Sequence, residues 1–87
     1  METEVKIFSM KGCPHCENLK NKLNENNIDY IEIDVDENEE LYEIFSKKVD
    51  NQYLPAILMG KTAFVPDRSF HTIDEAVELV KKNLLRD

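Results

Sequence analysis

The chain has 87 residues, of which 41% are hydrophobic, and its formal net charge at pH 7 is −7. We expect residues 1–87 to form one small domain with a modest core, and the acidic balance argues against a nucleic-acid or an anionic membrane partner. No apolar run approaches the roughly 20 residues that span a bilayer, and no basic start followed by an apolar run indicates a signal peptide, so we expect a cytoplasmic protein without a membrane partner.

The first predicted element is a strand, because Val5–Ser9 is a short and largely apolar run. A helix is expected from Pro14 to about Asn26–Asn27, where asparagine tolerates the left-handed conformation of helix ends. The apolar stripe of this helix consists of Cys16, Leu19 and Leu23.

The middle of the chain predicts a second strand and a second helix. Ile31, Ile33 and Val35 alternate with acidic residues, as in a strand. Asp36 is expected to cap the following helix, with Glu39 three residues later as in a variant of the capping box. The expected buried face of this helix consists of Leu41, Ile44, Phe45 and Val49.

The last third of the chain predicts a hairpin and a final helix. A strand over Pro55–Met59 turns at Gly60-Lys61 and returns through Ala63–Val65, and residues 66–69 are expected to form a loop. The run Thr72–Glu75 is a capping box that opens the last helix. This helix is expected to bury Ile73, Ala76, Val77, Val80 and Leu84.

These elements have the order β-α-β-α-β-β-α. The first two strands, joined by a crossover helix, are expected to run parallel, whereas the hairpin makes the last two antiparallel. The sequence therefore predicts an α/β fold with a four-stranded mixed sheet and helices on both faces.

Cys13 and Cys16 are the only cysteines, and they stand where the first strand gives way to the first helix. This spacing puts one sulfur at the helix N-terminus and the other one turn inside, which suits reversible disulfide chemistry. The alternative is two buried cysteines that pack as small hydrophobic residues. A paired spacing in a reducing compartment favours the redox interpretation.

Several features are expected to stabilise a thiolate at Cys13. Pro14 fits the first helical position, so that the next two N–H groups point back toward the sulfur. A protonated His15 and the nearby Lys11 would add positive charge. These effects predict a Cys13 pKa between roughly 3.5 and 7.5 instead of about 8.5. Cys16 lies on the apolar stripe and is expected to stay a neutral thiol that resolves the mixed disulfide.

Pro55 is the second informative residue. It opens the third strand, where a cis peptide bond is plausible. This would leave the N–H and C=O of Leu54 free to pair with an extended ligand beside the cysteines. Taken alone, Pro55 would be an ordinary proline at the start of a strand, but its place after a Cys-Pro-x-Cys helix favours the functional interpretation.

The chain resembles the glutaredoxins, a branch of the thioredoxin-like proteins. The resemblance covers nearly the whole length: the element order, the Cys13–Cys16 motif after the first strand and the proline at the third strand. It implies a thioredoxin-like fold, glutathione as the reductant, and disulfide-containing or glutathionylated proteins as substrates. A monomer without a resident metal ion is expected.

The resemblance also implies which residues bind glutathione. The Leu54 backbone, across from Pro55, would pair with the cysteinyl part, and Gln52 would lie near the glycine carboxylate. The start of the last helix, at Thr72, Ile73 and Asp74, would receive the γ-glutamyl carboxylate on its free N–H groups.

Three departures from the family pattern leave alternatives open. His15 replaces the usual tyrosine between the cysteines, Lys11 is displaced by one position from the family lysine, and residues 65–71 replace a Gly-Gly pair before the last helix. One alternative is a redoxin of this shape that a thioredoxin reductase recharges. Another is a dimer in which Cys13 and external glutathione hold an iron–sulfur cluster of the [2Fe-2S] type.

Overall fold

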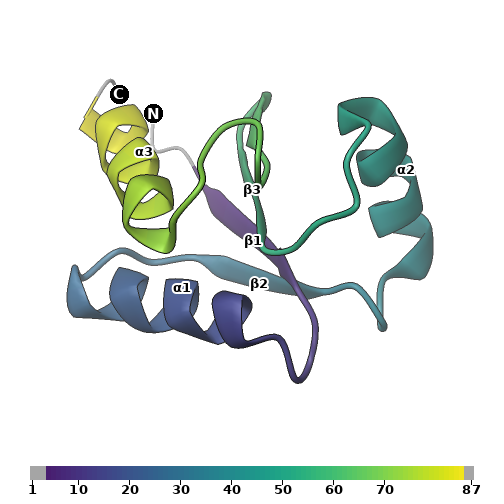
Figure 1. Ribbon diagram of the computed structural model, residues 1–87, viewed down its shortest axis with the longest axis horizontal. Coiled ribbons are helices and arrows are strands. Elements are labelled where there is room, and N and C mark those ends of the chain that lie inside the picture. Colours follow the sequence, from purple (N-terminus) through teal and green to yellow (C-terminus); the bar gives the residue numbers. More distant parts are fainter. Residues whose placement is uncertain (1–3, 86–87) are drawn as a thin grey trace.

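The computed structural model describes residues 4–85, in which a four-stranded sheet has the strand order β2-β1-β3-β4 (Figure 1). Strand β1 runs parallel to β2 and antiparallel to β3, and β3 is antiparallel to β4. The predicted mixed sheet is therefore confirmed. The strands are β1 (Val5–Ser9), β2 (Ile31–Asp34), β3 (Ala56–Met59) and β4 (Thr62–Phe64).

In the described part of the chain, three helices cover the two faces of the sheet: α1 (Pro14–Glu25), α2 (Glu39–Val49) and α3 (Ile73–Leu85). Helices α1 and α3 lie on one face and α2 lies on the other (Figure 1). None of these helices combines the length and the apolar character that a membrane crossing requires. The prediction of helices on both faces is confirmed.

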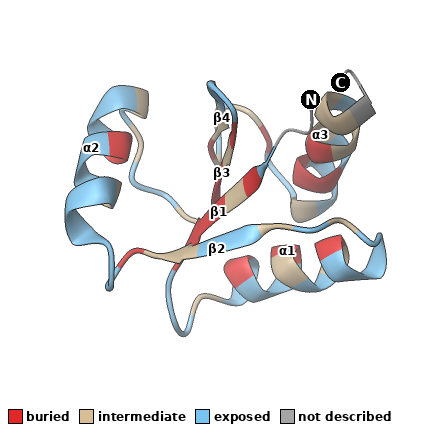
Figure 2. Cartoon of the chain, turned by 180° about the vertical axis from the view of Figure 1, so that it is seen from behind, coloured by how far each residue is buried: buried red, intermediate tan, exposed pale blue. Residues whose placement is uncertain are grey.

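The larger hydrophobic cluster lies between the sheet and the α1–α3 pair. Ile7 and Ile57 face each other in the β1–β3 register and are fully buried. Leu19 and Leu23 of α1 belong to the same cluster, and the whole predicted stripe of this helix is fully buried. Figure 2 shows the buried parts of β1, α1 and α3 in red. On α3, Ala76, Val77 and Val80 are buried, while Ile73 and Leu84 are partly buried against the same cluster. Burying each large aliphatic side chain contributes roughly 1.5–3 kcal/mol.

The buried face of α2 differs from the predicted one. Leu41 and Ile44 are 48% and 57% exposed, whereas Phe45 is buried and Tyr42 and Val49 are partly buried. The cause is Phe8 of β1, on which the Phe45 ring stacks with a centroid distance of 4.3 Å. The Tyr42 ring meets Phe8 at 5.8 Å. These aromatic contacts turn the helix so that Leu41 and Ile44 face outward.

The start of α2 also differs, because Asp36 does not cap it. The Asp34 carboxylate accepts the Asp36 N–H at 2.9 Å, and the Asn38 side chain donates to the Asp34 carbonyl at 2.9 Å. This Asx-type turn delays the helix, whose N-cap is Asn38 without a side-chain capping bond. The helix therefore begins at Glu39.

The left-handed end of α1, the glycine turn of the hairpin and the cap of α3 are confirmed, whereas several strand ends differ from the prediction by one residue. Asn27, just past α1, has a left-handed φ of 57°, and Gly60 in the β3–β4 turn has a φ of 61°. Strand β3 begins one residue after Pro55, and β2 ends one residue before Val35. Strand β4 spans Thr62–Phe64, one residue earlier at both ends than the expected Ala63–Val65. The capping box at α3 forms as predicted, with the Glu75 N–H donating to Thr72 Oγ1 at 3.1 Å.

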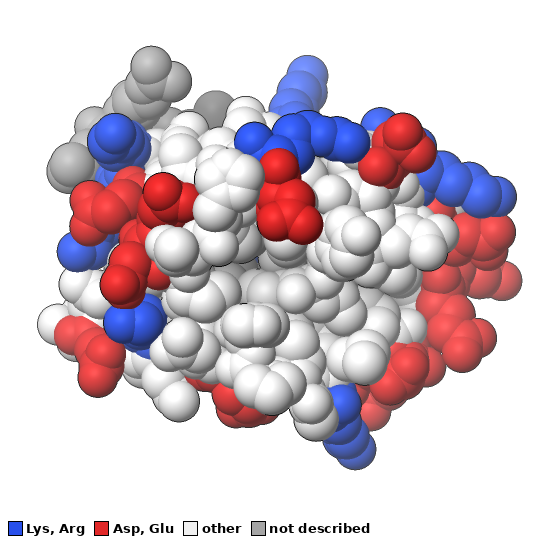
Figure 3. All heavy atoms as spheres, in the orientation of Figure 1, with Lys and Arg blue, Asp and Glu red and all other residues white. Residues whose placement is uncertain are grey.

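Charged side chains are unevenly spread over the surface. In Figure 3, acidic side chains gather over the α2 side and over the α3 side of the molecule, while uncharged side chains occupy the middle of the same face. A partner that approaches this face meets a neutral centre inside a charged rim.

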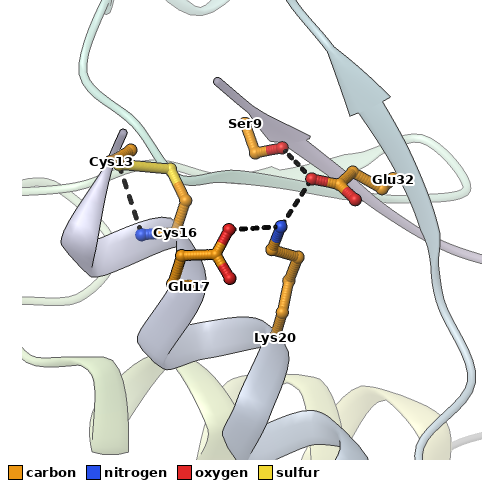
Figure 4. The surroundings of a disulfide bond; sticks show 6 residues. All are labelled: Ser9, Cys13, Cys16, Glu17, Lys20 and Glu32. Atoms are coloured by element: carbon orange, nitrogen blue, oxygen red, sulfur yellow. Dashed lines mark hydrogen bonds and ion pairs between the residues drawn. A yellow bond between two sulfur atoms is a disulfide. The ribbon is translucent and has the colours of Figure 1, made fainter. Parts of the chain in front are cut away.

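A network of charged side chains fastens the first turns of α1 to the sheet (Figure 4). The Lys20 ammonium donates to Glu32 on β2 at 2.7 Å and to Glu17 at 2.9 Å, and the buried Ser9 hydroxyl donates to the same Glu32 oxygen at 2.6 Å. These bonds to Lys20 and Ser9 lower the pKa of the Glu32 carboxyl. The bonds to Glu32 and Glu17 raise the pKa of Lys20.

We predict that Glu32→Gln destabilises the fold at pH 7 by about 1 kcal/mol, since water screens the partly exposed pair. Because Lys20 and Ser9 hold the pKa of Glu32 below its ordinary value of 4.5, its contribution is complete above that value and is lost as the pH falls through the lowered one. Urea unfolding of both proteins between pH 7 and about pH 3 measures this, and the difference should vanish at the acid end.

The matched control is Glu43→Gln, which removes an exposed ion pair with Lys47 at 3.0 Å on α2. This change should cost no more than about 0.5 kcal/mol. A pH-independent gap between wild type and Glu32→Gln would contradict the assignment.

Candidate active site

Cys13 and Cys16 form a disulfide at the start of α1, with their Cα atoms 5.3 Å apart (Figure 4). Cys13 is the N-cap of α1 in an extended conformation, Pro14 occupies the first turn, and the Cys16 N–H donates to Cys13 Sγ at 3.2 Å. Gly12 precedes them with a φ of 80°. Since a Cβ there would meet nothing within 4 Å, glycine serves the backbone conformation rather than close packing.

The two sulfurs differ in their surroundings. Cys16 is fully buried on the α1 stripe, whereas Cys13 is only partly buried. The N–H group of Cys16 is one of the helix-terminal donors that lack an intrahelical partner, and such donors favour negative charge. The arrangement therefore favours a charged sulfur at Cys13 and a neutral one at Cys16.

A cavity of about 510 Å³ opens next to the turn that carries the disulfide. The structure brings five of the predicted site residues together around it: His15, Leu54, Pro55, Thr72 and Ile73. They come from the first turn of α1, the segment before β3 and the start of α3. This is a groove between three segments that lie far apart in the sequence.

Three predicted site residues lie elsewhere. Lys11 lines a separate hollow with Glu17 and Lys20, on the β2 side of α1. Gln52 lines a hollow at the C-terminal end of α2. The Asp74 carboxylate binds the Lys22 ammonium of α1 at 2.8 Å. The fold therefore does not place Lys11, Gln52 or the Asp74 carboxylate on the groove.

The segment before β3 supplies unpaired backbone groups. The Leu54–Pro55 peptide bond is cis, as predicted. Within residues 4–85, neither the N–H nor the C=O of Leu54 hydrogen-bonds to another group of the chain. Both are therefore available to an extended ligand in the groove.

Residues 65–71 form the outer wall of the groove, through Pro66, Asp67, Phe70 and His71. The sequence predicts a loop over 66–69 and a stretch at 65–71 in place of the family's Gly-Gly pair, but no motif in it indicates a binding wall. Tyr53 and Asn18 complete the lining, and their closeness in sequence to Pro55 and Cys16 is the only signal that could have indicated them.

Side chains hold this wall against the C-terminal end of α2. The Arg68 guanidinium donates to the Val49 carbonyl and, at 3.2 Å, to the Asp50 carbonyl. The Asn51 side-chain amide donates to the Pro66 carbonyl at 3.1 Å. The wall is therefore tied to the element that lies on the opposite face of the sheet.

The start of α3 is only partly free to bind an anion. Glu75 Oε1 accepts the N–H of His71 at 2.7 Å and that of Thr72 at 3.2 Å. The N–H groups of Ile73 and Asp74 have no partner within residues 4–85. Two free N–H groups therefore remain at the start of α3, next to the carboxylate of Glu75.

The chain matches the family model described as Glutaredoxin over residues 5–64. It is 37% identical over 57 residues to the N-acetyl-S-hydroxy-L-cysteine reductase of Bacillus subtilis (strain 168), covering 66% of this chain and 61% of that protein. It is 32% identical over 74 residues to the Gene 56 protein of Mycobacterium phage L5, covering 80% of this chain and 72% of that protein. The chain therefore spans less than two thirds of the length of the Bacillus relative.

Solved structures show the same fold. The thioredoxin-like protein BC3987 superimposes with a TM-score of 0.68 at 18% identity, covering 91% of this chain and 97% of that chain. A glutaredoxin from Brucella melitensis gives a TM-score of 0.66 at 22% identity, covering 98% and 86%. These structures establish a thioredoxin-like fold. The match to the family model over residues 5–64 shows that the chain belongs to the glutaredoxin family.

Proposed function

We propose that the protein is a dithiol–disulfide oxidoreductase that reduces disulfides through Cys13 as the nucleophile and Cys16 as the resolving thiol. The observation that carries this proposal is the asymmetry of the pair. The partly exposed Cys13 sulfur accepts a helix-terminal N–H at 3.2 Å, and Cys16 is fully buried one turn inside α1.

In the proposed cycle, the Cys13 thiolate attacks one sulfur of a substrate disulfide. The substrate S–S bond breaks, a mixed disulfide forms on Cys13, and the first thiolate leaves and takes a proton from water. The Cys16 sulfur then attacks Cys13 Sγ and expels the second thiolate, which receives the Cys16 proton. Two electrons pass to the substrate, and the protein ends with the Cys13–Cys16 bond.

Glutathione is the electron donor that the family predicts. The groove beside His15, the unpaired backbone of Leu54 and the free N–H groups of Ile73 and Asp74 support it. Glutathionylated proteins would then be substrates together with protein disulfides.

A second candidate donor is a protein reductase of the thioredoxin reductase class. No Lys or Arg lines the groove among residues 4–85, Gln52 lies outside it, and Glu75 holds the N–H of Thr72. Glutathione carries two carboxylates, and the groove offers few groups to bind them. These observations therefore favour a protein reductase as the electron donor.

The name of the Bacillus relative indicates a further substrate class, the S-hydroxy cysteine group. The same centre would handle it if Cys13 attacked the oxidised sulfur and expelled hydroxide, with Cys16 resolving the mixed disulfide as before. We include a cytoplasmic location in the proposal, since a reducing compartment keeps such a pair poised for reduction of substrates.

An iron–sulfur cluster shared by two copies is the remaining alternative. Within residues 4–85, no group of three or more His, Cys, Asp or Glu side chains is placed to hold a metal. A cluster would therefore need Cys13 of both copies and two external thiols. Brown protein after anaerobic purification would favour it.

We predict that the Cys13 thiol ionises below the ordinary pKa of about 8.5, because the Cys16 N–H and the helix terminus stabilise its thiolate. Thiolate absorbance against pH in reduced Cys16→Ser measures this sulfur alone. The matched variant Cys13→Ser reports the buried Cys16, which should ionise at higher pH. Equal midpoints in the two variants would contradict the assigned roles.

We predict that Cys13→Ser reduces a glutathione mixed disulfide no faster than the reaction without protein, because the attacking sulfur is gone. Cys16→Ser should keep the first attack and accumulate a mixed disulfide on Cys13, which intact-protein mass spectrometry detects. Near-normal turnover by Cys13→Ser would exclude the proposed mechanism.

Coupled assays with each electron donor decide between the two candidates. Since the groove lacks cationic side chains, we predict that a thioredoxin reductase with NADPH reduces the Cys13–Cys16 bond faster than millimolar glutathione does. A rate with glutathione that equals or exceeds the rate with the reductase would assign glutathione as the donor.

A further inference from the structure

The groove beside the disulfide has an electrostatic character that the exchange chemistry does not use. Its lining includes one carboxylate side chain, Asp67, and no Lys or Arg among the described residues. A second carboxylate, Glu75, bonds to the backbone of two lining residues, His71 and Thr72. The groove therefore has negative charge at its wall and at its α3 end.

Two cations near these carboxylates in the chain or at the start of α3 bind other groups. Arg68 follows Asp67, but its guanidinium donates to carbonyls at the end of α2. Lys22 of α1 binds the Asp74 carboxylate at 2.8 Å. His71 Nδ1 lies 4.0 Å from Asp67 and can offset it only when the imidazole is protonated. Among residues 4–85, neither Asp67 nor Glu75 forms an ion pair with a Lys or Arg side chain.

The position of Glu75 in the capping box also disfavours an anionic ligand at the start of α3. Its carboxylate already occupies two N–H groups at the start of α3, which is where the carboxylate of an anionic ligand would find donors. A second carboxylate there would meet repulsion from the first and would find only the donors of Ile73 and Asp74. A neutral group would avoid this repulsion, and a cationic group would be attracted to the carboxylate.

We propose that Asp67 and Glu75 determine the charge preference of the groove, so that the preferred substrate is a peptide disulfide with cationic residues beside its cysteine. This inference rests on the proposed function, because it concerns the substrate of the same Cys13–Cys16 centre. The bound peptide would lie along the free backbone of Leu54 with its cysteine at Cys13.

The experiment measures single-turnover reduction of three symmetrical disulfides made from acetylated, amidated tripeptides. The sequences are Lys-Cys-Lys, Gln-Cys-Gln and Glu-Cys-Glu, which differ only in charge. The protein is reduced beforehand and freed of reductant, and the assay is run at low salt and at about pH 8, where an ordinary histidine is uncharged. Wild type should prefer the lysine peptide over the glutamate peptide by roughly tenfold.

The test variant is Asp67→Asn with Glu75→Gln. Asparagine keeps the left-handed backbone at position 67, where φ is 66°, and glutamine keeps the capping box. The control is Asp50→Asn with Glu78→Gln, which removes the same two charges away from the groove. Asp50 also has a left-handed φ, of 52°, and Glu78 lies one turn further along α3.

We expect the test variant to lower the ratio of the lysine rate to the glutamate rate at least threefold more than the control does. Comparing variants cancels the intrinsic reactivity of each peptide disulfide. An equal change in both variants would show that only the overall charge of the protein matters and would overturn the proposal. A wild-type preference for the glutamate peptide would overturn it as well.

The neutral glutamine peptide separates this inference from the proposed function. If wild type reduces that peptide no faster than Cys13→Ser does, the proposed exchange mechanism itself is wrong. If wild type reduces it in a Cys13-dependent reaction, the mechanism stands and the charge ratios alone decide the inference.

Discussion

The hydrogen bond from the Cys16 N–H to the Cys13 sulfur requires α1 to begin at one particular residue. If the helix began one residue earlier or later, the two cysteines would be rotated about the helix axis by about a quarter turn. Cys16 would then no longer lie on the buried stripe of α1. Gly12 and Pro14 define this start locally, by a positive φ and by a ring that suits the first turn. The buried α1 stripe and the Lys20–Glu32 pair then fix the helix on the sheet. The redox pair is therefore positioned by both the local sequence and the tertiary packing.

Features that depend on neighbouring residues could be read from the sequence. Four such features are found in the structure as predicted. They are the placement of the two cysteines, the proline in the first turn of α1, the left-handed Asn27 and the Thr72–Glu75 capping box. The sheet followed as well, because a crossover helix demands parallel strands and a glycine turn demands antiparallel ones. In each case the interacting groups lie within a few residues of each other, or topology leaves one choice.

Features that depend on distant contacts could not be read in this way. The buried face of α2 was missed because Phe8, more than thirty residues away, selects Phe45 and Tyr42 over Leu41 and Ile44. The groove was only half predicted, since its wall at 65–71 is held by bonds to the end of α2. Closeness in sequence to Cys13 suggested Lys11, and family position suggested Gln52, but in the fold these residues line other hollows.

The carboxylates of the groove and the thiolate of Cys13 are in electrostatic conflict. Negative charge near Cys13 opposes its thiolate, whereas the helix terminus favours it, and both act over the same few ångströms. A cationic substrate resolves this conflict, because its charge offsets the carboxylates while it brings the disulfide to the sulfur. An anionic substrate strengthens the conflict, since it adds further negative charge beside the Cys13 thiolate, Asp67 and Glu75. For cationic disulfides, the affinity of the groove and the stability of the Cys13 thiolate therefore increase together. Selectivity for this class of substrate then requires no conformational change of the protein.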